Sequence, residues 1–167
     1  NRAQKVLFSE PYLTLGQVVL VNRMQAAEMR KTRNEADPVM LLKANPVKIG
    51  VMAGTSYAEF ALALFPLAEV VPFDAKESMM EAARSGTVTA AFYDEVELKR
   101  YVNDRPDALI DLQFIVLEES RDYLAVAIPP ENVRMQAWLK QYFAYREPLD
   151  IDGMIRQYGS LYGDRTH

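Results

Sequence analysis

The stretch that decides the fold is Val47-Lys-Ile-Gly-Val-Met-Ala-Gly-Thr-Ser-Tyr57. Its apolar residues alternate with a lysine and a glycine before Gly54, which is typical of a strand that ends in a turn. The spacing from Ser56 to Glu59 is that of a capping box, which predicts a helix start. Backbone N–H groups at such a turn, with the helix dipole behind them, favour a carboxylate or phosphate against Gly54, Thr55 and Ser56. The alternative is an ordinary turn that is capped by its own side chains and binds only water.

Length, charge and composition limit the class of protein. The chain has 167 residues, half of them hydrophobic, which suits a globular protein with one core or two small lobes. Its formal net charge of −4 gives no basic surface for nucleic acid or for an anionic membrane. It has no cysteine, and its one histidine is the last residue, His167. We therefore expect no nucleic-acid partner, no cofactor, no histidine-based triad and no thiolate or multi-histidine metal site.

Targeting signals are not evident in the sequence. No apolar run approaches the roughly 20 residues of a membrane span, and no segment resembles a signal peptide. The chain begins with Asn1 rather than methionine, as a processed or excised piece of a longer protein would.

The chain as a whole alternates short strands with helices. Apolar runs predict strands over 18–21, 47–52, 70–73 and 88–93, and longer runs follow at 109–117 and 123–128. Helices are predicted over 39–43, 60–65, 74–85, 95–102, 131–145 and 150–162, and the segment 25–36 is predicted as a solvated helix or an ordered linker. This alternation predicts an α/β fold with a mainly parallel sheet flanked by helices.

Three details of these helices can be tested against a structure. Asp74 has the position and spacing of an N-cap, and Gly86 that of a stop after the same helix. Trp138 and Phe143 suit core anchors of the helix over 131–145.

In parallel sheets ligands bind at the carboxyl ends of the strands, and Asp94 is predicted at such an end, as Thr55 is.

Several segments also match a known family in order and spacing. They are Arg2 with Phe8-Ser9-Glu10-Pro11-Tyr12, Gln17 to Val21, Ile49 to Thr55, Ala83 to Asp94, and Asp152-Gly153-Met154-Ile155. Together they resemble the family 3 solute-binding proteins, the periplasmic amino-acid receptors of bacterial ABC importers with a type II periplasmic-binding fold. The Phe-Ser-acid-Pro-Tyr box and the Ala-Gly-Thr turn are specific in combination, whereas either alone would be weak.

The resemblance implies two α/β lobes that are joined by two crossing strands and hold the ligand between them. On that pattern residues 1–21 are a remnant of the first lobe and the first crossing strand, and 22–117 are the second α/β lobe. Residues 118–167 are the second crossing strand, over 123–128, and the C-terminal helices. Most of the first lobe has no counterpart in this sequence.

The resemblance further implies a set of ligand-binding residues. Arg2 would grip the α-carboxylate of the ligand with two charged hydrogen bonds. Thr55 would close on the same carboxylate from the second lobe, with Ser56 beside it. Asp94 would receive the α-ammonium of the ligand.

Met52 and Tyr57 would line the pocket for the ligand's side chain, although Tyr57 is bulkier than the polar residues common there. From the residues alone, Arg2 is better explained as a solvated arginine near a chain end. Asp94 is as well explained as the cap of the helix that begins at Glu95. Both alternatives stay open at this point.

The function expected from the resemblance is binding of an amino acid by lobe closure, in an ABC importer or in the extracytoplasmic sensor domain of a membrane protein. The partners would be a small amino-acid-like ligand, a membrane transporter or receptor, and a second copy of the chain. The location would be periplasmic or extracytoplasmic. The alternatives are an enzyme on the same fold, a cyclohexadienyl-type dehydratase, and a scaffold without a ligand. We expect no catalytic residues, because Glu118-Glu119, Asp150 and Asp152 lie in predicted turns or helix starts, where solvated carboxylates are the default.

Overall fold

The computed structural model describes residues 6–33, 35–147, 149–150, 153–154 and 157. The chain divides into two compact units, one formed by 17–119 and the other by 1–16 together with 120–167. Two strands, β2 (Leu13–Asn22) and β6 (Leu112–Leu124), contribute residues to both units. Here the structure differs from the expected second crossing strand over 123–128, because β6 begins much earlier. No helix in the described residues could cross a membrane.

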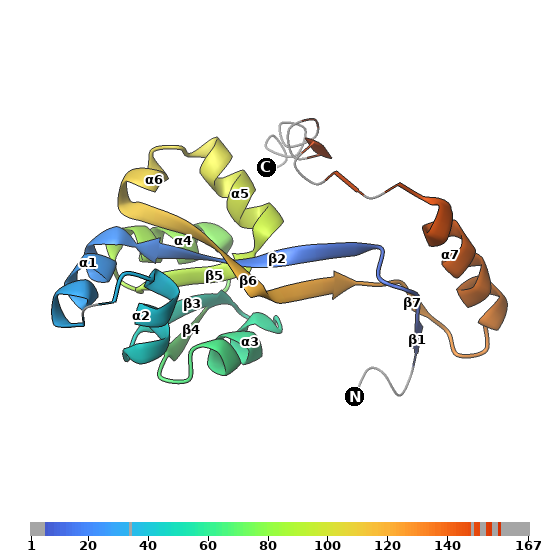
Figure 1. The fold of residues 1–167 in the computed structure, drawn as a ribbon, viewed down its shortest axis with the longest axis horizontal. Coiled ribbons are helices and arrows are strands. Elements are labelled where there is room, and N and C mark those ends of the chain that lie inside the picture. Colours follow the sequence, from blue (N-terminus) through green and yellow to red (C-terminus); the bar gives the residue numbers. More distant parts are fainter. Residues whose placement is uncertain (1–5, 34, 148, 151–152, 155–156, 158–167) are drawn as a thin grey trace. The chain divides into compact units, whose positions relative to one another are not determined.

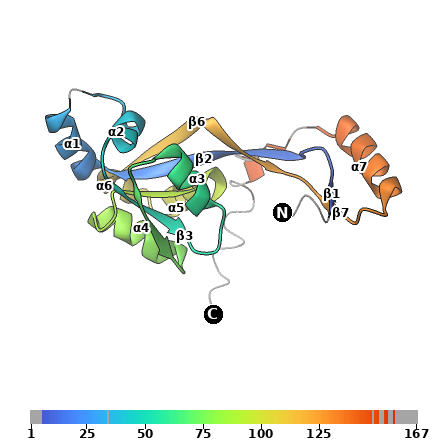
Figure 2. The same ribbon diagram turned by 90° about the horizontal axis from the view of Figure 1, so that it is seen from below.

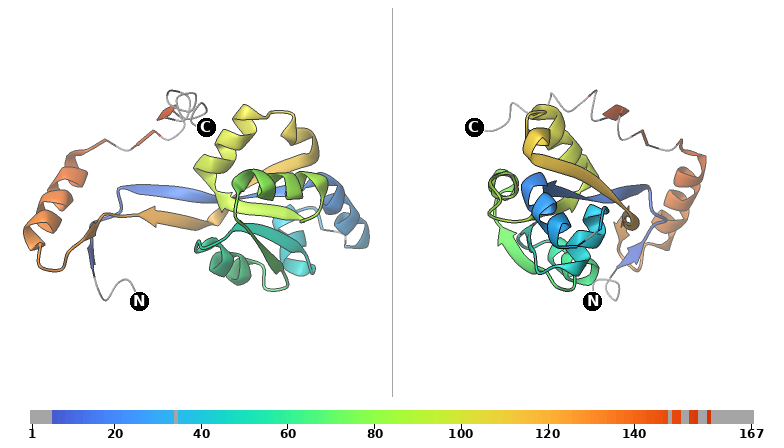
Figure 3. Two further views of the ribbon diagram at one scale, coloured as in Figure 1. Left: turned by 180° about the vertical axis from the view of Figure 1, so that it is seen from behind. Right: turned by 60° about the vertical axis from the view of Figure 1, so that its left-hand side comes forward.

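The larger unit is built on a five-stranded sheet with the strand order β4-β3-β5-β2-β6. The three strands not yet given bounds are β3 (Lys48–Met52), β4 (Glu69–Phe73) and β5 (Ala90–Asp94). β3 runs parallel to both β4 and β5, and β2 runs antiparallel to β5 (Figure 1). The predicted α/β class with a mainly parallel sheet is therefore confirmed. β4 is the outermost strand on one side of the sheet (Figure 3). Pro72 is tolerated in it because an outermost strand has a hydrogen-bonded neighbour on one side only.

Helices cover both faces of this sheet. They are α1 (Arg23–Thr32), α2 (Pro38–Ala44), α3 (Tyr57–Leu64), α4 (Lys76–Ser85), α5 (Glu95–Asp104) and α6 (Ala108–Asp111). α3 lies on one side of the sheet and α4 on the other, as Figure 2 shows. Two separate apolar clusters result, one on each face.

The side-chain alternation of β2 shows how the sequence produces these two clusters. Val19 and Val21 belong to the cluster beneath α1, α2 and α3, and Val18 and Leu20 to the cluster beneath α4, α5 and α6. All four side chains are fully buried. Because successive side chains of a strand point to opposite faces, a continuous apolar run is what a strand covered on both sides requires.

Local capping explains several helix boundaries. Asp37 accepts a hydrogen bond from the Val39 N–H at 2.8 Å, and α2 starts at Pro38. Gly86 ends α4 with φ +81°, a left-handed conformation that glycine adopts without strain. The prediction that Asp74 caps α4 is wrong, since the N-cap is Ala75, whose side chain makes no capping bond.

The smaller unit contains a two-stranded antiparallel sheet of β1 (Leu7–Phe8) and β7 (Ala127–Ile128), followed by α7 (Val133–Tyr145). Ser9 lies within the Phe-Ser-acid-Pro-Tyr box, and its hydroxyl accepts a hydrogen bond from the Val126 N–H at 3.0 Å. The Tyr12 N–H donates to the Leu124 carbonyl at 2.9 Å. The box therefore ties the N-terminal segment to the end of β6 and to the residues just after it.

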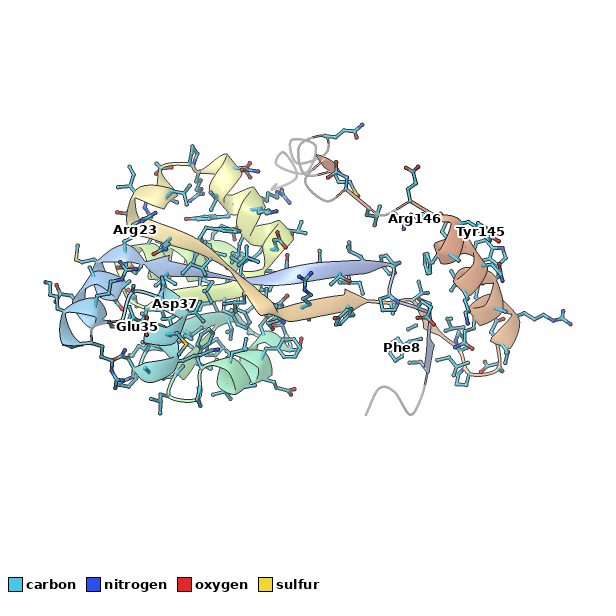
Figure 4. All side chains as sticks on the ribbon, in the orientation of Figure 1. Phe8, Arg23, Glu35, Asp37, Tyr145 and Arg146 are labelled. Atoms are coloured by element: carbon cyan, nitrogen blue, oxygen red, sulfur yellow. The ribbon has the colours of Figure 1, made fainter. Side chains whose placement is uncertain are left out.

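The face of α7 differs from its prediction. Trp138 is 59% exposed and stacks on Tyr142, so the expectation that it anchors a core is wrong. Phe143 is partly buried and stacks on Tyr12 with ring centroids 5.7 Å apart. Figure 4 labels Tyr145, which is also exposed, at the end of the helix. Most of the predicted last helix, with Asp152, lies outside the described residues.

Candidate functional site

The candidate site is the edge of the sheet at which β3, β4 and β5 end. Because β3 is parallel to both neighbours, the three carboxyl ends share this edge, and each strand leads directly toward a helix start. The register pairs Ile49 with Ala90 and Gly50 with Ala91, so β3 and β5 run side by side toward this edge. The turn that contains Thr55 and the carboxylate of Asp94 therefore lie at neighbouring strand ends, both within the larger unit.

The turn after β3 is built by its glycine and its threonine. Gly54 has φ +71°, a left-handed value, and nothing lies within 4 Å of where a Cβ would stand. The Thr55 hydroxyl donates a hydrogen bond to the Met52 carbonyl at 2.7 Å, which closes the turn. Ser56 is exposed and is the N-cap of α3, but its side chain makes no capping bond, so the predicted capping box is wrong. The Thr55 hydroxyl proton is thus already used, which leaves exposed backbone and the Ser56 hydroxyl to meet an anion.

Asp94 is the N-cap of α5, and its carboxylate accepts a hydrogen bond from the Glu97 N–H at 2.9 Å. Burial raises the pKa of the Asp94 carboxyl above its ordinary value, and the Glu97 carboxylate adds to this effect. Three groups lower this pKa in part: the N–H groups of Glu97 and Val96, which bond to the carboxylate, and the Lys76 ammonium. Since the net direction is upward, the surroundings do not fully compensate the negative charge of Asp94, and a bound cation would stabilise it.

Two predicted pocket residues take different positions at this edge. Met52 ends β3 and is partly buried beside the cluster under α4 and α5. Tyr57 is buried, and its ring packs against the rings of Phe92 at 5.3 Å and Tyr93 at 4.8 Å between centroids. The structure thus uses Tyr57 to fill the core, where the prediction had it line a pocket. Arg2 lies outside the described residues.

The structure adds three side chains that sequence reasoning did not nominate. Gln17 of β2 is opposite Asp94 in the register and is buried. Lys76 begins α4, and Glu97 lies in the first turn of α5, where the two form an ion pair. One signal could have revealed Lys76, since it follows the third parallel strand as Thr55 and Asp94 follow the other two.

The double role of Asp94 gives a testable stability pattern. A folded-state pKa above the unfolded value means that the folded protein binds the proton more tightly. The resulting stabilisation is fully present below the ordinary aspartate pKa of about 3.9 and is lost as the pH rises through the folded pKa. Asp94→Asn keeps the cap without the charge, so at pH 7 we expect it to be at least as stable as wild type. Asp94→Ala also loses the cap and should be less stable than Asp94→Asn by about 1 kcal/mol.

Urea unfolding of the three proteins between pH 4 and pH 7 measures this pattern. The gap between Asp94→Asn and wild type should widen in favour of asparagine as the pH rises. Equal losses in the asparagine and alanine variants would show that the carboxylate charge itself stabilises the fold.

No model of a protein family matches the chain, and no curated protein matches it. Solved structures do match. The amino-acid ABC transporter substrate-binding protein AbpA of Streptococcus pneumoniae, bound to L-arginine, is 21% identical with a TM-score of 0.67, over 95% of this chain and 63% of that one.

Two further solved structures resemble the chain to a similar extent. The periplasmic VFT2 domain of BvgS from Bordetella pertussis is 17% identical with a TM-score of 0.66, over 94% of this chain and 62% of that one. An ancestral amino-acid-binding protein, described as a precursor of cyclohexadienyl dehydratase, is 21% identical with a TM-score of 0.63, over 94% and 63%. The chain thus spans about three fifths of the length of each protein that it matches. It has, over that part, the type II periplasmic-binding fold of the bacterial amino-acid solute-binding proteins.

Proposed function

We propose that this chain is the ligand-binding lobe of a receptor for an amino acid or a similar small zwitterion. The observation that carries the proposal is the position of Asp94 and the Thr55 turn at adjacent ends of parallel strands. An amino acid presents an ammonium and a carboxylate on one carbon. Asp94 offers a partly buried anion for the ammonium, and the turn before α3 offers N–H groups and the Ser56 hydroxyl for the carboxylate.

The proposed mechanism is closure rather than chemistry. A ligand that gains more contacts in a closed arrangement of two lobes than in an open one shifts the equilibrium toward closure. Arg2 is proposed to bind the ligand's carboxylate, because a guanidinium can form two parallel hydrogen bonds to it. Met52 is proposed to touch the ligand's side chain.

The partner is proposed to be a membrane transporter or a receptor that responds to closure, with the chain in the periplasm or outside the cytoplasm. Two matched proteins support this choice, since one is the binding component of an ABC transporter and the other is a periplasmic domain. A homodimer through exposed apolar surface, such as Trp138 and Tyr142 on α7, is a further proposal.

An enzyme is the second candidate, because one matched protein is described as a precursor of cyclohexadienyl dehydratase. That protein is itself described as binding amino acids, which favours binding for the present chain. The acidic pairs that sequence reasoning set aside give catalysis no support. Asp150 accepts the Gly153 N–H at 2.9 Å on an exposed surface. Glu118 and Glu119 lie within strand β6, so their prediction as turn residues is wrong.

Calorimetry with a panel of amino acids tests the proposal. We expect heat of binding for wild type with at least one member, and affinity at least tenfold lower for Asp94→Asn, because a charge-assisted hydrogen bond is lost. Asp37→Asn is the matched control, since Asp37 also caps a helix, α2, away from the strand ends. It should bind like wild type.

Three outcomes would count against the proposal. Binding by Asp94→Asn as tight as by Asp37→Asn would remove Asp94 from the site. Turnover of a cyclic dienyl acid would favour the enzyme, and silence across the whole panel would favour a scaffold.

A further inference from the structure

A second charged pair lies beside Asp94 at the same edge of the sheet. Lys76 begins α4 after the end of β4, and its ammonium forms an ion pair with the Glu97 carboxylate in the first turn of α5. The two side chains are 38% and 30% exposed. Two helices that start from different strands are thus linked beside Asp94.

These groups act on one another electrostatically. The Lys76 ammonium lowers the pKa of the Asp94 carboxyl and the Glu97 carboxylate raises it, and both also act on the Tyr93 hydroxyl, whose pKa burial raises above its ordinary value. Gln17 faces Asp94 from β2 and carries no charge. Two carboxylates and one ammonium therefore leave this cluster with one negative charge.

The ion pair leaves the uncompensated negative charge on Asp94, because Lys76 is paired with Glu97. As long as Lys76 is held on Glu97, the ammonium is not free to neutralise Asp94. A ligand ammonium then meets an anion that lacks a full counter-charge. A second carboxylate on the ligand would meet Glu97 as a like charge and could be accepted only if it displaced Glu97 from Lys76.

We propose that the Lys76–Glu97 ion pair is the specificity element of this site, which selects amino acids with a neutral or cationic side chain and rejects dicarboxylic ones. The inference rests on the proposed function and adds to it the class of ligand. Lys76 and Glu97 act as positioning residues, since they set the charge that the ligand meets at Asp94.

The test compares glutamine with glutamate, which have nearly the same shape and differ by one charge. Wild type should prefer glutamine. Glu97→Gln removes the repelling carboxylate and releases Lys76, so the preference for glutamine over glutamate should fall about tenfold. Lys76→Gln leaves Glu97 without its counter-charge, so the preference should rise and binding of lysine or arginine should tighten.

Opposite signs in the two variants are what separates this role from a structural one. Both substitutions break the same ion pair, so a merely structural role would change affinity for both ligands in the same direction. The protein should remain folded, because a partly exposed ion pair contributes little stability and the Glu97 N–H that bonds to Asp94 is retained. Glu69→Gln is the matched control, because Glu69 pairs with Lys48 where β4 and β3 begin, at the other end of the strands from Asp94. It should change the preference less than twofold.

A second readout needs no ligand. The pKa of the Asp94 carboxyl, followed by NMR titration, should fall in Glu97→Gln and rise in Lys76→Gln. Shifts of the same sign in the two variants, or none, would overturn the inference even if amino acids bind. Absence of binding by wild type to every amino acid would overturn the proposed function and this inference with it. Tight binding of glutamate by wild type would overturn the inference alone.

Discussion

Replacing Phe92 with alanine should lower the free energy of unfolding of the larger unit by about 3–5 kcal/mol. Phe92 is fully buried in β5, a strand that has a neighbour on each side. Its ring meets the rings of Tyr57 at 5.3 Å and Phe65 at 6.2 Å in edge-to-face geometry. The substitution removes apolar burial and leaves a cavity, and the sheet beneath it cannot collapse to fill the space.

Urea unfolding, followed by far-UV circular dichroism, measures this loss. Phe92→Leu keeps most of the volume and should lose less than half as much. Phe8→Ala is the control for the same chemical change on a surface, because Phe8 is 44% exposed, and we expect a loss below 1 kcal/mol. A loss for Phe92→Ala as small as that of Phe8→Ala would show that the cluster beneath α3 is not close-packed. Asp94 lies two residues after Phe92 in the same strand, so Phe92→Ala should also lower the affinity for a ligand.

Asn22→Ala should destabilise the same unit by about 3 kcal/mol. The buried Asn22 side chain accepts a hydrogen bond from the Gln25 N–H, which caps α1. Its amide also donates to the carbonyls of Ala83 at 2.9 Å and Arg84 at 3.1 Å, at the end of α4. Alanine removes a cap worth about 1 kcal/mol and leaves two carbonyls without this donor, at about 1 kcal/mol each.

Two variants divide this effect into its parts. Asn22→Asp keeps the acceptor for α1 but sets a carboxylate against the carbonyls that end α4, so it should be at least as destabilising as alanine. Asp37→Ala removes an exposed cap alone and should lose about 1 kcal/mol. If Asn22→Asp proved as stable as wild type, the hydrogen bonds from Asn22 to α4 would contribute nothing to the free energy of unfolding. Thermal and urea unfolding of the four proteins give the comparison.

Much of the fold could be predicted from the sequence because its signals are local. The apolar run of β2, the alternation before Gly54 and the glycine at Gly86 each state a backbone preference within a few residues. The buried side of α4 has a signal of the same local kind, since Met79, Met80, Ala82 and Ala83 follow helical spacing and are all buried.

The predictions that failed concern side chains whose surroundings are not local. Trp138 has the composition of a core anchor, yet it is exposed on α7. Asp74 has the spacing of a cap but lies one residue before Ala75, the N-cap of α4. Ser56 is the N-cap of α3, but its backbone angles are helical rather than extended, and its side chain makes no capping bond.

The sequence by itself determined the α/β class, the parallel strands and the position of Asp94 and Thr55 at strand ends. These follow from periodicity and turn residues, which act over short stretches of chain. Only the tertiary structure decided that Tyr57 fills the core and that Lys76 meets Glu97 beside Asp94. Burial and charge pairing depend on residues far apart in the sequence, and these are brought together only when β3, β4 and β5 align in one sheet.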